Sequence, residues 1–98
     1  MCITFFVLNP LTGEKSHVEF LIAFNRDEQS HRKTIPFGSF EDDPNIYAGE
    51  DLISQGTWLG INIKTGILAF LTNFDQKEPR QGKSRGRMIK KFLKTNFL

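Results

Sequence analysis

The sequence predicts an α+β fold in which an antiparallel sheet carries a C-terminal amphipathic helix. The sheet is predicted by short apolar segments, rich in β-branched and aromatic residues, that come in two pairs. Each pair is joined by turn-forming residues. The helix is predicted by apolar residues that recur at helical spacing near the C-terminus, with lysines among them.

The first pair of segments, residues 2–8 and 17–24, predicts an antiparallel hairpin. In such a hairpin the first residue of one strand lies beside the last residue of the other. We therefore expect Cys2 to lie near Phe24 and Asn25. Polar residues follow the second strand directly, so the hairpin brings them next to Cys2.

The second pair, residues 57–63 and 67–72, predicts another hairpin around a Lys-Thr-Gly turn. Its far end gathers Gly56, Thr57, Thr72 and Asn73. Residues 29–54, between the two hairpins, are acidic and rich in turn formers, and we expect them to be irregular apart from a short strand at 45–48.

The predicted helix begins near Gly86, with Ser84 as its N-cap. Its apolar side chains are Met88, Ile89, Phe92, Leu93 and Phe97. One helix over about four strands would leave a sheet face open, so we expect residues 1–98 to form a single partial domain.

Composition limits the class of protein. The 98 residues suffice for one small domain, and ten Phe argue against a disordered chain. No apolar run approaches the roughly 20 residues that span a bilayer, and no signal peptide is recognisable. A single Cys excludes an internal disulfide and suits a reducing compartment such as the cytoplasm. His and Cys spacing predicts no metal site.

Charge is unevenly distributed along the chain. Residues 1–76 carry five Lys or Arg and ten Asp or Glu, whereas residues 77–98 carry eight and one. A basic segment can bind an anionic surface, and a peripheral membrane contact through residues 77–94 is one interpretation. The alternative, which we favour, is a solvated helix face after a basic loop. We predict no nucleic-acid partner.

Cys2 is the first candidate for chemistry. Removal of the initiator Met would give Cys2 a free α-amine, whose ordinary pKa of about 8 suits a base for its own thiol. Arg26 would favour the thiolate form, and Asp27 would hold or orient the amine. The alternative is that Cys2 is a small buried hydrophobe at the start of a strand.

The other polar candidates follow predicted strands. Residues 25–28, Asn-Arg-Asp-Glu, form either a reactive cluster or an ordinary strand-ending turn with an ion pair. Asn73 is a candidate oxyanion donor, with Thr57 and Thr72 nearby, or else these residues simply cap strand ends. Trp58, the sole Trp, is expected to pack in the core.

These segments together resemble the transport-and-Golgi-organisation-2 family, also called NRDE proteins. The resemblance covers essentially the whole chain, and its motifs occur in the family's order and spacing. They are residues 1–6 (Met-Cys-Ile-Thr-Phe-Phe), 23–28 (Ala-Phe-Asn-Arg-Asp-Glu), 56–60 (Gly-Thr-Trp-Leu-Gly), 71–73 (Leu-Thr-Asn) and 85–87 (Arg-Gly-Arg). Two departures concern loops: Gln55 stands where the family usually has a first Gly, and Lys33 follows Arg32 where it often has Pro.

The resemblance implies a four-layer αββα N-terminal-nucleophile fold, similar to cysteine-type bile-salt hydrolases and penicillin acylases. By position, Cys2, Arg26 and Asp27 match the nucleophile and its partners in those enzymes. It also implies links to Golgi organisation and secretion, to the mobilisation of haem from mitochondria, and to lipid homeostasis. No cofactor is required, although haem is a candidate transported ligand.

Three functional hypotheses remain open at this point. The chain is a non-enzymatic trafficking protein that handles haem or an acyl lipid, in the cytoplasm or in association with the Golgi or mitochondria. Alternatively, it is an amidase or thioesterase that acts through Cys2, or a truncated chain without activity of its own. Sequence predicts no oligomeric state.

Overall fold

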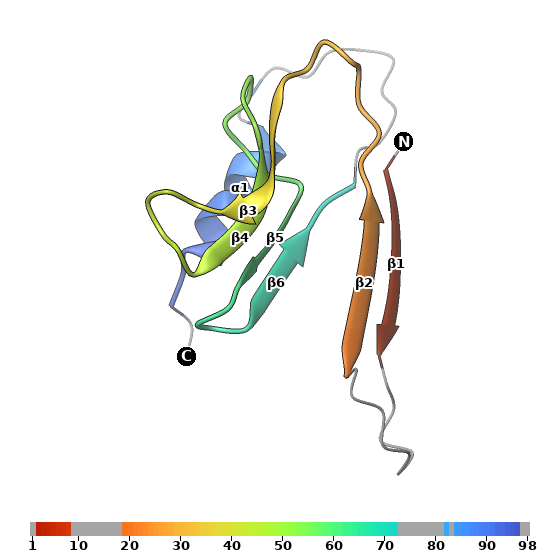
Figure 1. Ribbon diagram of the computed structural model, residues 1–98. Coiled ribbons are helices and arrows are strands. Elements are labelled where there is room, and N and C mark those ends of the chain that lie inside the picture. Colours follow the sequence, from red (N-terminus) through yellow and green to blue (C-terminus); the bar gives the residue numbers. More distant parts are fainter. Residues whose placement is uncertain (1, 9–18, 73–81, 83, 97–98) are drawn as a thin grey trace.

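The computed structural model of the chain describes residues 2–8, 19–72, 82 and 84–96. In this part, strands precede one helix and form two separate antiparallel sheets, β1-β2 and β3-β4-β5-β6 (Figure 1). The elements are β1 (Ile3–Leu8), β2 (Phe20–Asn25), β3 (Thr34–Ser39), β4 (Ile46–Asp51), β5 (Leu59–Asn62), β6 (Ile67–Phe70) and α1 (Arg85–Leu93). The predicted α+β class, the antiparallel pairing and the C-terminal helix are therefore confirmed.

The first hairpin is a two-stranded ribbon that stands apart from the larger sheet (Figure 1). Its register runs from Ile3 opposite Asn25 to Leu8 opposite Phe20. The predicted turn, and the predicted strand start at His17, lie outside the described residues. Strand β2 ends at Asn25, one residue beyond the predicted end at Phe24, so the ribbon is slightly longer there than predicted.

The second sheet contains a strand that the sequence pattern did not predict. Residues 34–39 form β3, so the expectation of irregular structure there was wrong. Pro36 and Gly38 weaken the strand signal, and the β3–β4 register shifts between Ile35 and Gly38, which marks a bulge or irregularity. Strand β4 also runs on to Asp51 instead of ending at residue 48.

The second predicted hairpin is confirmed as β5-β6, with Asn62 opposite Ile67. The Asn62 side chain explains the tight turn that joins the two strands. Its Oδ1 accepts hydrogen bonds from the backbone N–H groups of Lys64 and Thr65, at 3.0 and 3.2 Å. Gly66 follows with φ of 74°, a conformation that suits glycine.

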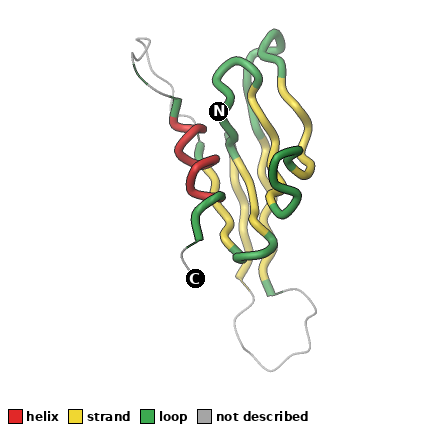
Figure 2. The backbone as a smooth tube through the Cα atoms, turned by 90° about the vertical axis from the view of Figure 1, so that its left-hand side faces the viewer, coloured by secondary structure: helices red, strands yellow, loops and turns green. Residues whose placement is uncertain are grey.

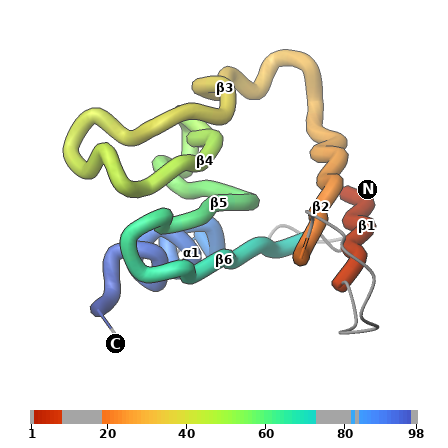
Figure 3. The backbone as a smooth tube through the Cα atoms, turned by 60° about the horizontal axis from the view of Figure 1, so that its bottom comes forward, coloured from red at the N-terminus to blue at the C-terminus, as the bar shows by residue number. Residues whose placement is uncertain are grey.

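Helix α1 packs on β5 and β6 and provides the centre of the core (Figures 2 and 3). Leu93 is fully buried, and a Cβ at Gly60 would lie 2.4 Å from Leu93 Cδ1, so only glycine leaves room for it. The Asn62 Nδ2 donates to the Leu93 carbonyl at 2.9 Å and so caps the helix end. The core residues are Phe40, Ile46, Ala48, Ala69 and Leu93.

The predicted N-cap of α1 is confirmed, because the Ser84 hydroxyl accepts a hydrogen bond from the Gly86 N–H at 3.3 Å. The helix ends at Leu93, and Phe97 lies outside the described residues. Met88, predicted on the apolar face, is 70 % exposed, which corrects that assignment. Across the described ranges we find no helix that is both long and apolar enough to span a bilayer.

Candidate functional site

The register of the ribbon brings Cys2 to the polar cluster. Ile3 pairs with Asn25, so Cys2 lies at the end of the ribbon from which Arg26 and Asp27 emerge. Figure 1 shows the start of β1 beside the end of β2. Cys2 is 8 % exposed and its thiol is free. Asn73, the fourth predicted site residue, lies outside the described residues.

The amino terminus of the chain changes the pKa of the Asp27 carboxyl group. A hydrogen bond from the terminal amine, reinforced by the positive charge of that amine, lowers the pKa of Asp27 below its ordinary value. This amine belongs to residue 1 and Asp27 is exposed, so a role for Asp27 toward an α-amine on Cys2 stays a prediction.

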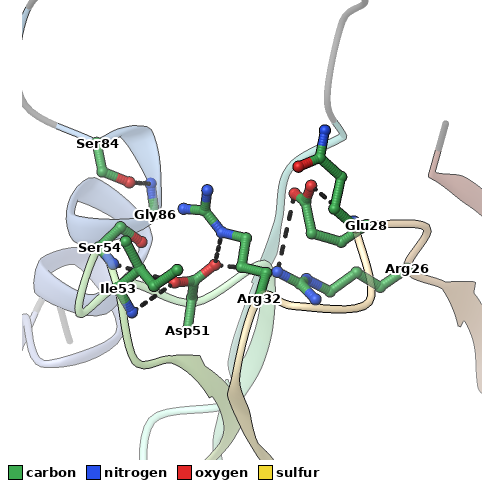
Figure 4. A network of polar contacts seen from close by, with 9 residues as sticks. Arg26, Glu28, Arg32, Asp51, Ile53, Ser54, Ser84 and Gly86 are labelled. Carbon is green, nitrogen blue, oxygen red and sulfur yellow. Dashed lines mark hydrogen bonds and ion pairs between the residues drawn. The ribbon is translucent and has the colours of Figure 1, made fainter.

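The Arg26 guanidinium is held between two groups of the four-stranded sheet. Its Nη2 donates to Asp51 Oδ2 at 3.0 Å (Figure 4). Its Cζ also lies 4.4 Å from the centroid of the Trp58 ring, which is a cation–π contact. Glu28 Oε2 is farther from Nη2, at 3.9 Å. Arg26 therefore joins the ribbon end to the second sheet.

Asp51 is the centre of this polar network. Its Oδ2 accepts from both Arg26 and Arg32, whereas its Oδ1 accepts from the backbone N–H groups of Ile53 and Ser54 at 2.9 and 3.0 Å (Figure 4). The Asp51 side chain is 8 % exposed. A carboxylate this buried is stable in its charged form because its hydrogen-bonding capacity is well used.

Trp58 occupies a different position from the one predicted. It is only partly buried and is not among the core residues. A Cβ built on Gly49 would lie 2.3 Å from the Trp58 ring, so the ring lies directly against this glycine of β4. Its role in the described structure is to support the Arg26 guanidinium.

Comparison with known proteins identifies the family. The family model described as Transport and Golgi organisation 2 matches residues 1–97. The chain belongs to the Transport and Golgi organisation 2 family. No solved structure matches the chain.

Curated relatives within the Transport and Golgi organisation 2 family support this assignment. The Transport and Golgi organization protein 2 homolog of Bos taurus is 34 % identical over 101 residues, which cover 99 % of this chain and 36 % of the relative. The Homo sapiens homolog is 35 % identical, covering 98 % and 36 %, and the Drosophila melanogaster protein is 30 % identical, covering 95 % and 35 %. The chain thus spans about a third of the length of the curated relatives it matches.

The structure explains one departure from the family resemblance. Gln55 stands where we expect the first of two glycines in this Transport and Golgi organisation 2 motif, and its φ is 57°. Residues other than glycine rarely adopt this left-handed backbone conformation, because their Cβ comes too close to the backbone. Gln55 offsets some of this strain, since its Oε1 accepts from Arg87 Nη2 at 3.3 Å.

We expect Gln55→Gly to stabilise the chain by about 1 kcal/mol, because glycine removes the left-handed strain. Urea denaturation of both proteins measures the difference. Ser54→Gly, at the preceding residue, which does not have positive φ, serves as the control and is expected to be destabilising. A loss of stability in Gln55→Gly as large as in the control would contradict this explanation.

The stability of the fold should depend on pH through Asp51. Burial raises the pKa of Asp51, but hydrogen bonds from Arg32 and from the Ser54 and Ile53 N–H groups outweigh burial, so the pKa is lowered. A lowered folded-state pKa stabilises the fold above the ordinary value of about 3.9 and ceases to do so as pH falls. The stability difference between wild type and Asp51→Asn should therefore shrink below about pH 4. A difference that is constant from pH 7 to pH 3 would contradict this.

The remaining predicted groups have ordinary structural partners. Thr57 is buried, its hydroxyl donates to the Leu59 carbonyl at 3.0 Å, and its N–H donates to the Gly86 carbonyl at 3.2 Å. The second of these hydrogen bonds holds the Gly-Thr-Trp-Leu-Gly segment against the start of α1. Thr72 is exposed at the end of the described segment. The described residues contain no cluster of His, Cys, Asp and Glu that could hold a metal ion.

Of the basic segment 77–94, the structure describes residue 82 and residues 84–94, which include α1. Lys90 Nζ pairs with Glu50 and Lys94 Nζ with Asp42, each at 2.6 Å. Arg87 instead donates to the uncharged Ser54 carbonyl at 2.9 Å. A contact of this segment with a membrane stays a prediction.

Proposed function

We propose that this chain serves transport and Golgi organisation, the role for which its relatives are named, and that it handles an apolar small molecule such as haem or an acyl lipid. The family match over residues 1–97 carries the first part of the proposal. The apolar surface of the β1-β2 ribbon supports the second part.

The ribbon exposes large apolar side chains on both faces. Phe5 and Phe6 are neighbours in β1, so their side chains point to opposite faces, and both are largely exposed. Val7, Leu8 and Leu21 extend this surface. Contiguous apolar surface of this kind is characteristic of binding sites for apolar ligands and partners.

Titration of the chain with haem tests the proposal. Binding should shift the Soret band, and Phe6→Asp should weaken binding at least tenfold because it puts a charge on the apolar surface. Ile63→Asp is the matched control, since Ile63 is similarly exposed, at 59 % against 64 %, but lies in the β5–β6 turn. An acyl lipid replaces haem in a parallel titration. Absence of binding in both titrations, or equal loss in the two variants, would contradict an apolar ligand on the ribbon.

The position of Cys2 favours a second candidate, an amidase or thioesterase of the N-terminal-nucleophile type. The support is a buried thiol at the ribbon end from which Arg26 and Asp27 emerge, together with the effect of the amino terminus on Asp27. In this reaction the thiolate attacks an acyl carbon, the amine or thiol leaves with a proton, and water releases the acyl group from sulfur. The αββα arrangement of such enzymes is likewise part of this proposal.

Intact-mass measurement tests the second candidate. The native protein should lack Met1 and should gain one acyl group on Cys2 from an electrophilic acyl probe. Cys2→Ser should remove the label. A mature protein that keeps Met1 would exclude this chemistry, because the α-amine of Cys2 would then be an amide and could not act as a base.

A further inference from the structure

We propose that Asp51 is the positioning residue of the Cys2 site: it fixes Arg26 and thereby the ribbon end that carries Cys2 and Asp27. This inference deepens the second candidate function and rests on it. Within the polar cluster that the sequence singles out, Arg26 lies 3.9 Å from Glu28, and its shorter contact reaches outside the cluster. Arg26 is anchored by a carboxylate of the other sheet, 25 residues farther along the chain.

Asp51 is itself rigidly held by its own loop. Its backbone N–H donates to the Gly56 carbonyl at 2.8 Å, and the Gln55 N–H donates to the Asp51 carbonyl at 2.8 Å. The side-chain Oδ1 accepts two further hydrogen bonds from backbone N–H groups of the same loop. The loop therefore fixes the carboxylate and leaves Oδ2 directed at the guanidinium groups (Figure 4).

Oδ2 of Asp51 accepts hydrogen bonds from both arginines of the β2–β3 connection. Arg26 and Arg32 flank that connection, and each donates to the same oxygen. Both ends of the connection are thus tied to one atom of the second sheet. The Leu52 N–H reinforces this junction by donating to the Lys33 carbonyl at 3.0 Å.

Arg26 transmits this constraint to the site. Arg26 directly follows Asn25, which pairs with Ile3, and directly precedes Asp27. Oδ2 of Asp51 and the ring of Trp58 fix the guanidinium from two directions. Loss of the Asp51 charge would release Arg26, and the backbone that carries Asp27 would then be held less firmly at the ribbon end.

The neighbouring ion pairs lack this arrangement. The Lys94–Asp42 pair has similar ionic chemistry, but its carboxylate is exposed and follows the end of β3 opposite to the end that pairs with Asp51. Asp42→Asn therefore removes the same charge without touching the ribbon, which makes it a matched control for Asp51→Asn.

The experiment compares wild type, Asp51→Asn, Arg26→Gln, the double variant and Asp42→Asn. The rate of Cys2 alkylation by iodoacetamide is measured from pH 6 to 10. Asp51→Asn and Arg26→Gln should each slow alkylation of the folded protein about tenfold, a modest effect for a displaced site group. The double variant should be no slower than either single variant, because Asp51 acts through Arg26. Asp42→Asn should match wild type.

A second readout does not depend on reactivity. The pKa of Asp27, followed by NMR of its carboxyl carbon, should rise toward its ordinary value in folded Asp51→Asn and remain lowered in Asp42→Asn. If Asp51→Asn does not fold, Asp51→Glu keeps the charge, displaces the carboxylate and should give the same two changes. An unchanged Asp27 pKa in folded Asp51 variants would overturn the proposal. A wild-type Cys2 that reacts no faster than in the unfolded chain, combined with an Asp27 pKa that does rise, would refute the second candidate function alone.

Discussion

Replacing Leu93 with alanine is expected to destabilise the fold by about 3–5 kcal/mol. Leu93 is fully buried and joins α1 to β5 and β6, where its Cδ1 fills the space that Gly60 leaves open. Truncation removes this contact and leaves a cavity, because Gly60 has no side chain to fill it. Urea denaturation followed by tryptophan fluorescence and circular dichroism measures the loss.

Met88→Ala is the control for this prediction. Met88 lies on the same helix and is 70 % exposed, so its truncation should cost no more than about 0.5 kcal/mol. Equal losses in the two variants would mean that α1 does not pack on the sheet through Leu93.

Gly56→Ala is expected to displace the start of α1 and to cost about 3 kcal/mol. A Cβ at Gly56 would lie 2.6 Å from the carbonyl carbon of Gly86 and 2.9 Å from the backbone nitrogen of Arg87. These are backbone atoms, which cannot move aside as the end of a flexible side chain can. Circular dichroism should show weaker helical signal together with the lower stability.

Gly38→Ala is the control for the Gly56 substitution. The nearest atom to a Cβ at Gly38 is the Pro36 carbonyl oxygen, at 4.0 Å, so the site has room. Stability should change by no more than about 1 kcal/mol there. Unchanged stability and helical signal in Gly56→Ala would contradict the close approach of loop and helix.

Local sequence signals were sufficient for the hairpins and the helix. The β5-β6 turn is determined by its own residues. The Asn62 side chain accepts a hydrogen bond from a backbone N–H group of the turn, and Gly66 adopts a positive φ. The N-cap at Ser84 is local in the same sense. Strand β3 was not predicted because Pro36 and Gly38 are poor strand formers. An irregularity in the β3–β4 hydrogen-bond ladder accommodates them.

The centre of the candidate site could not be predicted from local signals. Cys2, Arg26 and Asp27 could be placed at one ribbon end because one hairpin joins them, whereas Asp51 meets Arg26 and Arg32 through the tertiary fold. Asp51 accepts hydrogen bonds from the backbone N–H groups of Ile53 and Ser54, which is a local turn interaction, but a local pattern of this kind contains no information about guanidinium partners. The position of Trp58 could not be predicted from local signals either, because its ring contacts the Arg26 guanidinium instead of packing in the core.

The register of the β1-β2 ribbon is the foundation of the account, and NMR measures it directly. Cross-strand nuclear Overhauser effects between backbone protons should join Ile3 to Asn25 and Phe5 to Ala23. These contacts bring Cys2 to Arg26 and Asp27. Effects that instead join Ile3 to Ala23, or that are absent between the two strands, would separate the start of β1 from the segment that carries Arg26 and Asp27 and contradict the account.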